Sequence, residues 1–98
     1  MTDKRWIHVS FSWPIGVGAS TDSFEAVFSK AKYWMRYSRN CWMIYSGADL
    51  EVWRDRIRKI NGMEKQSVFL LEFHADEAAG YLPEWMWEKL HDYEESDG

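Results

Sequence analysis

The stretch RWIHVSFSW, residues 5–13, decides how the rest of the chain can be arranged. Apolar side chains at Ile7, Val9 and Phe11 alternate along it with polar side chains at the positions in between. Alternation with a period of two is typical of a strand that buries one face. Pro14 and the glycines that follow it end this strand and open a loop.

A helical period follows the loop. Asp22 and Glu25 have the spacing of a capping box, which predicts a helix that starts at Asp22. Apolar residues then recur at helical spacings as far as Met35. The members of this stripe are Phe24, Val27, Phe28, Ala31, Trp34 and Met35. The sequence therefore predicts one amphipathic helix over residues 22–35.

Two more strands and a second helix follow. Aromatic and β-branched residues at 41–46 predict a strand, in a hairpin with the residues that precede it. Ser46 and Asp49 form a second capping pair, and the apolar stripe behind them predicts a helix that stops at residues 61–62. Residues 67–74 predict the last strand, whose two faces are both largely apolar.

The order strand, helix, hairpin, helix, strand predicts an α+β fold of the ferredoxin-like βαββαβ kind, with an antiparallel sheet and helices on one face. A short C-terminal helix should start at residues 82–83, and its inward face is Leu82, Trp85, Met86 and Leu90. Residues 1–93 are expected to form a single domain, and residues 94–98 an acidic, frayed tail.

The periodicities also predict a core and an open sheet face. The expected core is Ile7, Val9, Phe11, Phe24, Val27, Phe28, Trp34, Leu50, Trp53, Ile57, Phe69 and Leu71. The other face of the sheet should present His8, Ser10, Ser12, Met43, Tyr45, Val68 and Leu70. That mixture is apolar enough to favour a covering partner, and a self-complementary homodimer is the simplest cover.

Cysteine content and hydropathy bear on the compartment. Cys41 is the single cysteine, so the chain forms no internal disulfide and offers no zinc-binding cysteine pair, and a buried thiol is expected there. No run has the length and apolar character of a signal peptide or a membrane span. These features favour a reducing, cytoplasmic location and no membrane partner.

Charge is distributed unevenly. Residues 1–40 carry six Lys/Arg and three Asp/Glu, whereas residues 67–98 carry one Lys and nine Asp/Glu, a balance of −8. A net charge of −4 argues against general nucleic-acid binding, but the asymmetry leaves room for a local basic face. Its candidates are Arg36, Arg39, Arg54 and Arg58. The acidic residues that interleave with Arg54 and Arg58 favour a solvated, salt-bridged helix face instead.

Three further motifs were weighed for chemistry. Gly16-Val17-Gly18 before a helix resembles a phosphate loop, but it lacks the Lys-Ser/Thr that completes one. Glu72, Asp76 and Glu77 follow one another near a strand end, where carboxylates could hold magnesium. A flexible loop and a solvated strand end are the favoured interpretations of these two motifs, so we expect no cofactor, no metal and no catalytic residue. The third motif is the set of histidines His8, His74 and His91, which lie in different elements and are not expected to share a metal ion.

A resemblance to a known family rests on three stretches. They are residues 33–44, YWMRYSRNCWMI; the predicted helix and strand over 46–73; and residues 80–88, GYLPEWMWE. Together they resemble the SinR-like small proteins, distant relatives of the small ferredoxin-like subunit of the CRISPR spacer-acquisition complex. The resemblance implies a βαββαβ fold and a homodimer joined through strands. Nuclease-active relatives carry a metal-binding acidic residue at the end of the first strand, where this chain has Ser12.

Ser12 decides between the functions that the resemblance allows. A neutral hydroxyl is a poor magnesium ligand, so we expect a non-catalytic, homodimeric protein-binding module. The genetic setting of this family implies a role in phage defence, counter-defence or a toxin–antitoxin pair. The candidate dimer or partner face is Tyr45, Leu70 and Trp87. Two alternatives stay open: a nucleic-acid-binding dimer that uses the four arginines, and a metal-dependent RNA or DNA nuclease in which Glu72 or Asp76 replaces the missing acid.

Overall fold

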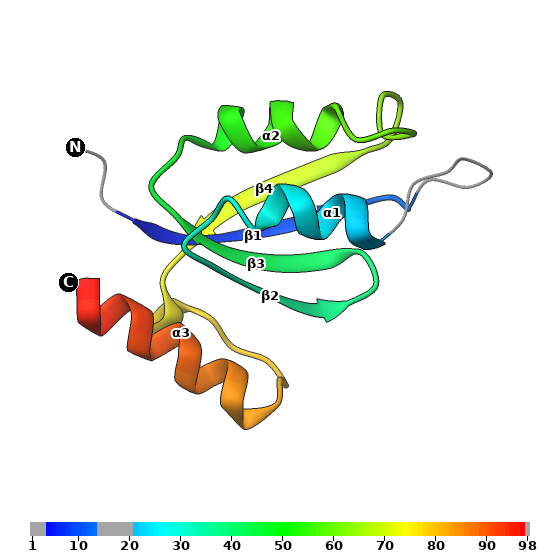
Figure 1. The fold of residues 1–98 in the computed structure, drawn as a ribbon. Coiled ribbons are helices and arrows are strands. Elements are labelled where there is room, and N and C mark those ends of the chain that lie inside the picture. Colours follow the sequence, from blue (N-terminus) through cyan, green and yellow to red (C-terminus); the bar gives the residue numbers. More distant parts are fainter. Residues whose placement is uncertain (1–3, 14–20, 98) are drawn as a thin grey trace.

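The computed structural model describes residues 4–13 and 21–97. These residues form an α+β fold with an antiparallel sheet and three α-helices, as the sequence predicts (Figure 1). In chain order the elements are β1 Arg5–Phe11, α1 Thr21–Phe28, β2 Tyr33–Ser38, β3 Cys41–Ser46, α2 Leu50–Arg58, β4 Val68–Phe73, the 3-10 turn η1 Ala75–Glu77 and α3 Glu84–Asp97. No helix of the described chain combines the length and apolar character needed to cross a bilayer.

The strand order in the sheet is β2-β3-β1-β4, and every neighbouring pair is antiparallel. It follows that β1 and β2 run in the same direction, with β3 between them, and that β3 and β4 run in the same direction, with β1 between them. The two crossovers, through α1 and α2, lie on one face of the sheet, and α3 lies on the other (Figure 1).

The first helix is shorter than the sequence predicts. It ends at Phe28, and residues 33–35, predicted as its last turn, lie in the edge strand β2 together with residues 36–38. Tyr33, Trp34 and Met35 satisfy either period, but aromatic residues favour strands, and β3 needs a hydrogen-bonded neighbour. The pairing of Trp34 with Ile44 and of Met35 with Met43 supplies that neighbour.

The face under α1 and α2 carries the larger core, which we call the helix-side core. Its buried members are Ile7, Val9, Phe11, Phe24, Phe28, Trp42, Ile44, Trp53, Ile57, Ile60 and Met63. The expected core residues Val27, Trp34 and Leu50 are partly buried against it.

The predicted capping pair at the start of α2 does not form. The Ser46 hydroxyl instead accepts hydrogen bonds from Trp53 Nε1 and from the Ala48 amide, both at 3.0 Å. Asp49 occupies the N-cap position without a side-chain capping bond.

The inward face of β4 is the opposite of the predicted one. Val68 and Leu70 pack against the helix-side core, whereas Phe69 and Leu71 are 60% and 52% exposed. Both faces of this strand are apolar, so its own sequence cannot distinguish them. The register decides, because Val9 pairs with Leu70 and Phe11 with Val68, and directly paired residues share a face.

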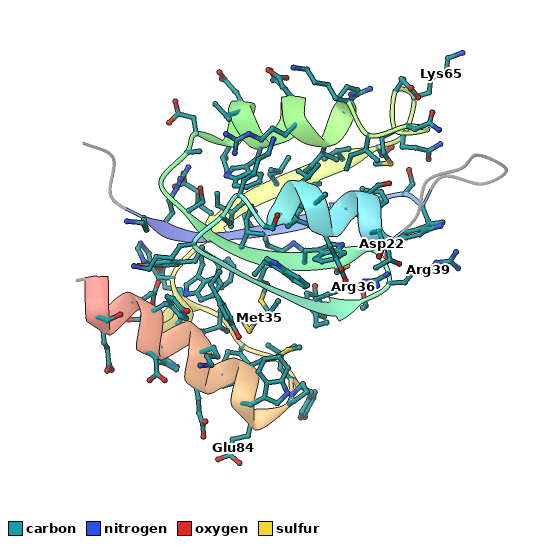
Figure 2. All side chains as sticks on the ribbon, in the orientation of Figure 1. Asp22, Met35, Arg36, Arg39, Lys65 and Glu84 are labelled. Carbon is teal, nitrogen blue, oxygen red and sulfur yellow. The ribbon has the colours of Figure 1, made fainter. Side chains whose placement is uncertain are left out.

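The second face of the sheet is partly covered by α3. The buried residues there, which we call the α3-side core, are Trp6, Met35, Met43, Tyr45, Ala75, Met86 and Leu90. Figure 2 shows Met35 pointing from the sheet toward α3. Trp6 Nε1 donates to the Leu90 carbonyl at 2.9 Å, and the Tyr45 hydroxyl donates to the Tyr93 carbonyl at 3.1 Å.

The C-terminal helix is therefore longer than the sequence predicts, and residues 94–97 belong to it. It spans 14 residues and continues to Asp97, through the residues expected to form a tail. Glu94 fixes its C-terminal half, because Glu94 Oε1 accepts from the Ala75 amide at 2.9 Å and Oε2 lies 3.4 Å from His74 Nδ1. Met86 and Leu90 point inward as predicted, but Trp85 is 49% exposed.

Candidate binding groove on the open sheet face

A groove of about 440 Å³ lies where α3 stops covering the sheet. Its floor includes Met43 of β3 and Leu71 and Phe73 of β4, and its wall is the segment 77–82 together with Trp87 and Leu90 of α3. The volume is that of a site for a side chain or a small ligand. Since most lining side chains are apolar or aromatic, the groove favours a ligand with a flat or apolar body.

Two polar side chains contribute to the groove from neighbouring parts of the sheet. His8 of β1 and Tyr37 of β2 contact each other through Nε2 and the hydroxyl oxygen. Burial lowers the pKa of His8 below 6.5. Burial, a hydrogen bond with Cys41 and the negative charge of its thiolate raise the pKa of Tyr37 to about 12. At pH 7 both side chains are thus uncharged, and each can still exchange hydrogen bonds with a ligand.

Cys41 lies next to this pair rather than in a core. It is only half-buried and belongs to neither of the two cores, so the expectation of a buried thiol was wrong. Its position follows from the pairing of Cys41 with Ser10, which places both side chains on the open face beside His8.

Large apolar side chains stay exposed around the groove. Leu71 and the fully exposed Tyr81 line it, Tyr37 is 39% exposed, and Phe69 lies two residues from Leu71 on the same face of β4. Edge strand β4, the loop before α3 and strand β2 therefore together present an apolar border. Clusters of this kind on a small domain mark interaction surfaces more often than scattered single residues do.

The four candidate arginines form no single basic site. Arg36 and Arg39 lie at the end of the β2–β3 hairpin (Figure 2), where Arg36 donates to the backbone carbonyls of Ser38 and Arg39. The guanidinium of Arg36 also lies 5.0 Å from the centre of the Trp42 ring, and that of Arg39 lies 4.7 Å from that of Trp13. The donors of Arg36 are therefore largely used within the chain, whereas Arg39 makes a ring contact with Trp13.

The arginines of α2 are similarly occupied. Arg54 Nε pairs with Asp55 at 3.1 Å, and Arg58 donates to the Glu64 carbonyl beyond the end of the helix. Both side chains belong to the exposed side of α2, on the sheet face opposite the groove. This geometry agrees with the solvated, salt-bridged helix face that the sequence favours.

The candidate partner-face residues are placed in three different environments. Tyr45 is buried beneath α3, and Leu70 faces the helix-side core, so neither lies on an open surface. Their expected positions depended on the wrong inward face for β4 and on leaving that side of the sheet uncovered. Trp87 is half-buried and does line the groove.

Ser12 has a structural role at the end of β1. Its hydroxyl donates to Gln66 Oε1 at 2.7 Å and accepts from the Ser67 amide at 3.0 Å, which joins β1 to the start of β4. Glu72 pairs with Ile7, which lies five residues before Ser12. At about 3.3 Å per residue, the positions of Glu72 and Ser12 are about 16 Å apart along the strand direction. Its carboxylate contacts Arg5 at 2.7 Å. Glu72 therefore cannot complete a metal site at Ser12.

Carboxylates elsewhere do not gather either. Within the described part of the chain, no three His, Cys, Asp or Glu side chains are close enough together to hold a metal ion. Asp76 and Glu77 belong to the 3-10 turn η1, and Glu77 lines the groove. The Gly16-Val17-Gly18 motif lies outside the described residues.

Sequence reasoning missed the groove because its lining comes from all four strands, from η1 and the loop after it, and from α3. The signal that could have indicated it is the run Ala78-Ala79-Gly80-Tyr81-Leu82, which is apolar, lacks helical or strand periodicity and follows a strand.

Comparison of the chain with protein-family models, with curated proteins and with solved structures finds no match.

Proposed function

We propose that the chain is a non-catalytic protein-binding module whose docking surface is the border of the groove. The observation that carries this proposal is the exposure of Phe69, Leu71 and Tyr81 beside an apolar groove on the half-covered sheet face. Exposing several large apolar side chains in one area is unfavourable in water unless a partner covers them. Tyr, Trp and Met, which are abundant in and around the groove, are also enriched at protein interfaces.

Affinity capture from an extract of the native host tests the docking surface. The baits are the wild-type chain, Leu71→Asp in the groove and Val52→Asp on α2, where Val52 is 39% exposed. We expect a protein that wild type and Val52→Asp retain and that Leu71→Asp loses, with unchanged circular dichroism for all three. Equal recovery by both variants, or recovery of nucleic acid alone, contradicts the proposal.

We propose that two copies also pair through the edges of β4. This strand lies at one edge of the sheet, and its residues Val68–Phe73 include no Pro, Lys or Arg that would block a further strand. An antiparallel pairing about a two-fold axis would bring the exposed Phe69 side chains of the two copies together. Such a pairing would give the homodimer expected from the sequence, but it would join the copies through a strand edge and not through the open face of the sheet.

Light scattering tests the homodimer. Wild type at tens of micromolar should give twice the 11.7 kDa mass of one chain. Phe69→Lys should give the monomer mass, because a charged side chain at a strand edge opposes pairing. Val52→Lys is the matched control and should remain dimeric. A wild type that is monomeric at this concentration rules the pairing out.

We propose a ferredoxin-like relationship as the finer assignment of the fold, together with the kinship to SinR-like small proteins and a setting in phage defence or counter-defence. The support is the pair of crossovers, each of which connects two parallel strands that have a third between them.

Incubation with labelled RNA and DNA in magnesium or manganese should give no cleavage. Cleavage that disappears in Glu72→Ala would restore the nuclease alternative.

A further inference from the structure

The chemistry of the groove narrows the kind of partner, and this step rests on the proposed function. Glu77 is the one charged side chain among the described residues that line the groove. His8 and Tyr37 add no positive charge at pH 7, because the pKa of His8 is lowered and Tyr37 keeps its proton. The groove thus combines a single negative charge with apolar walls.

Aromatic rings make up much of those walls. Tyr37, Phe73, Tyr81 and Trp87 all line the groove, and ring faces attract cations. The chain already uses this interaction elsewhere: Arg39 lies 4.7 Å from the centre of the Trp13 ring, and Arg56 lies 4.7 Å from that of Trp53. The rings of those internal pairs lie outside the groove. An arginine fits such walls better than a lysine does, because its planar guanidinium stacks on rings.

Charge also decides against a second copy of this chain as the occupant. The segment that supplies β4, the groove wall and α3 is residues 67–98, which carries nine acidic residues and one lysine. Two such segments brought face to face would repel each other, whereas a basic segment would be attracted.

We propose that the groove receives the guanidinium of an arginine from a basic segment of a protein partner. Glu77 supplies the counter-charge at the border, and Tyr81 and Trp87 supply ring faces. His8 and Tyr37 offer hydrogen-bonding groups at the floor. The apolar side chain of Leu71, which lines the groove, contacts the rest of the segment.

Titration followed by NMR tests the arginine specificity on the full chain. The probes are acetyl-Ala-Arg-Ala-amide and the same peptide with citrulline, which replaces the charged guanidinium by a neutral urea of the same shape. We expect the arginine peptide to shift the indole signal of Trp87 and the amide signals of Leu71 and Tyr81. The citrulline peptide should bind at least about threefold more weakly. Equal binding of both peptides, or no shift with either, overturns the inference.

Two matched pairs of variants locate the contact. Tyr81→Ala removes a groove ring and should weaken the arginine peptide about threefold, whereas Trp85→Ala removes an exposed ring outside the lining and should not. Glu77→Gln should weaken it to a similar degree. Glu84→Gln should have no effect, since Glu84 points away from the sheet (Figure 2). Equal effects within either pair overturn the assignment.

The two proposals can fail separately. If Leu71→Asp loses the captured partner but Glu77→Gln and Tyr81→Ala retain it fully, the docking surface stands and the arginine site is wrong. If Leu71→Asp retains the partner, the docking surface itself is wrong.

Discussion

The two faces of the sheet are built from the same strands, yet they are covered to different degrees. On one face α1 and α2 enclose a core in which Phe28, Trp42 and Trp53 are fully buried and their rings are in contact. On the other face α3 covers only one part, over Trp6 and Tyr45, and leaves Phe69 and Leu71 in water. The first face thus carries the larger buried core, and the second leaves large apolar side chains exposed.

This difference teaches that burial follows the covering elements and not the hydrophobicity of a strand alone. In β4 the side chains alternate between the two environments, and the more exposed members, Phe69 and Leu71, are no less apolar than Val68 and Leu70. Exposure along β4 is therefore set by where the helices lie and not by residue type.

The largest expected effect comes from the helix-side core. Phe28→Ala should lower the free energy of unfolding by about 3–5 kcal/mol, because it leaves a cavity among closely packed rings. Leu71→Ala on the open face should change it by less than about 0.5 kcal/mol. Urea denaturation of both variants measures the contrast. Similar losses would mean that the two faces do not differ as described.

A smaller effect is expected where α3 is attached. Trp6→Phe removes the indole N–H that donates to the Leu90 carbonyl and should cost about 1–3 kcal/mol. Amide hydrogen exchange should then quicken along α3 more than along α2. Trp85→Phe is the control at an exposed position of the same helix. An unchanged exchange rate along α3 in Trp6→Phe would contradict the role of this hydrogen bond.

The smallest effect concerns pH. Burial lowers the pKa of His8 in the folded state, so below pH 6.5 the unfolded chain takes up this proton first. The stability is therefore complete above pH 6.5 and is lost progressively as the pH falls toward the folded-state pKa. Between pH 7.5 and 5.5, wild type should lose more stability than His8→Gln, as measured by denaturation at each pH. Parallel pH profiles would show that His8 does not contribute.

Local periodicity was sufficient to predict β1, β3, α2 and the inward residues Met86 and Leu90, since each of these elements carries one unambiguous pattern. It failed at residues 33–38, which satisfy both a helical and a strand period, so only the pairing with β3 decides. It also failed for the face of β4, which depends on the register with β1. Long-range pairing is not encoded in the spacing of a single segment.

The candidate site was less predictable still. Among the predicted contact residues, Trp87 alone lines the groove, while Arg36, Arg54 and Arg58 make contacts within the chain. The groove exists because α3 packs on the far face of the sheet, and its length and placement depend on the acceptors at Leu90 and Tyr93 and on Glu94. Those contacts join residues that are 84, 48 and 19 positions apart in the chain.

The span between Trp6 and Leu90 has a consequence for synthesis on the ribosome. Strands β1 to β4 precede residues 84–97 in the chain, so α3 is synthesised after the whole sheet. Until then Trp6, Met35 and Tyr45 have no cover, and the nascent chain presents a much larger apolar surface than the finished fold does.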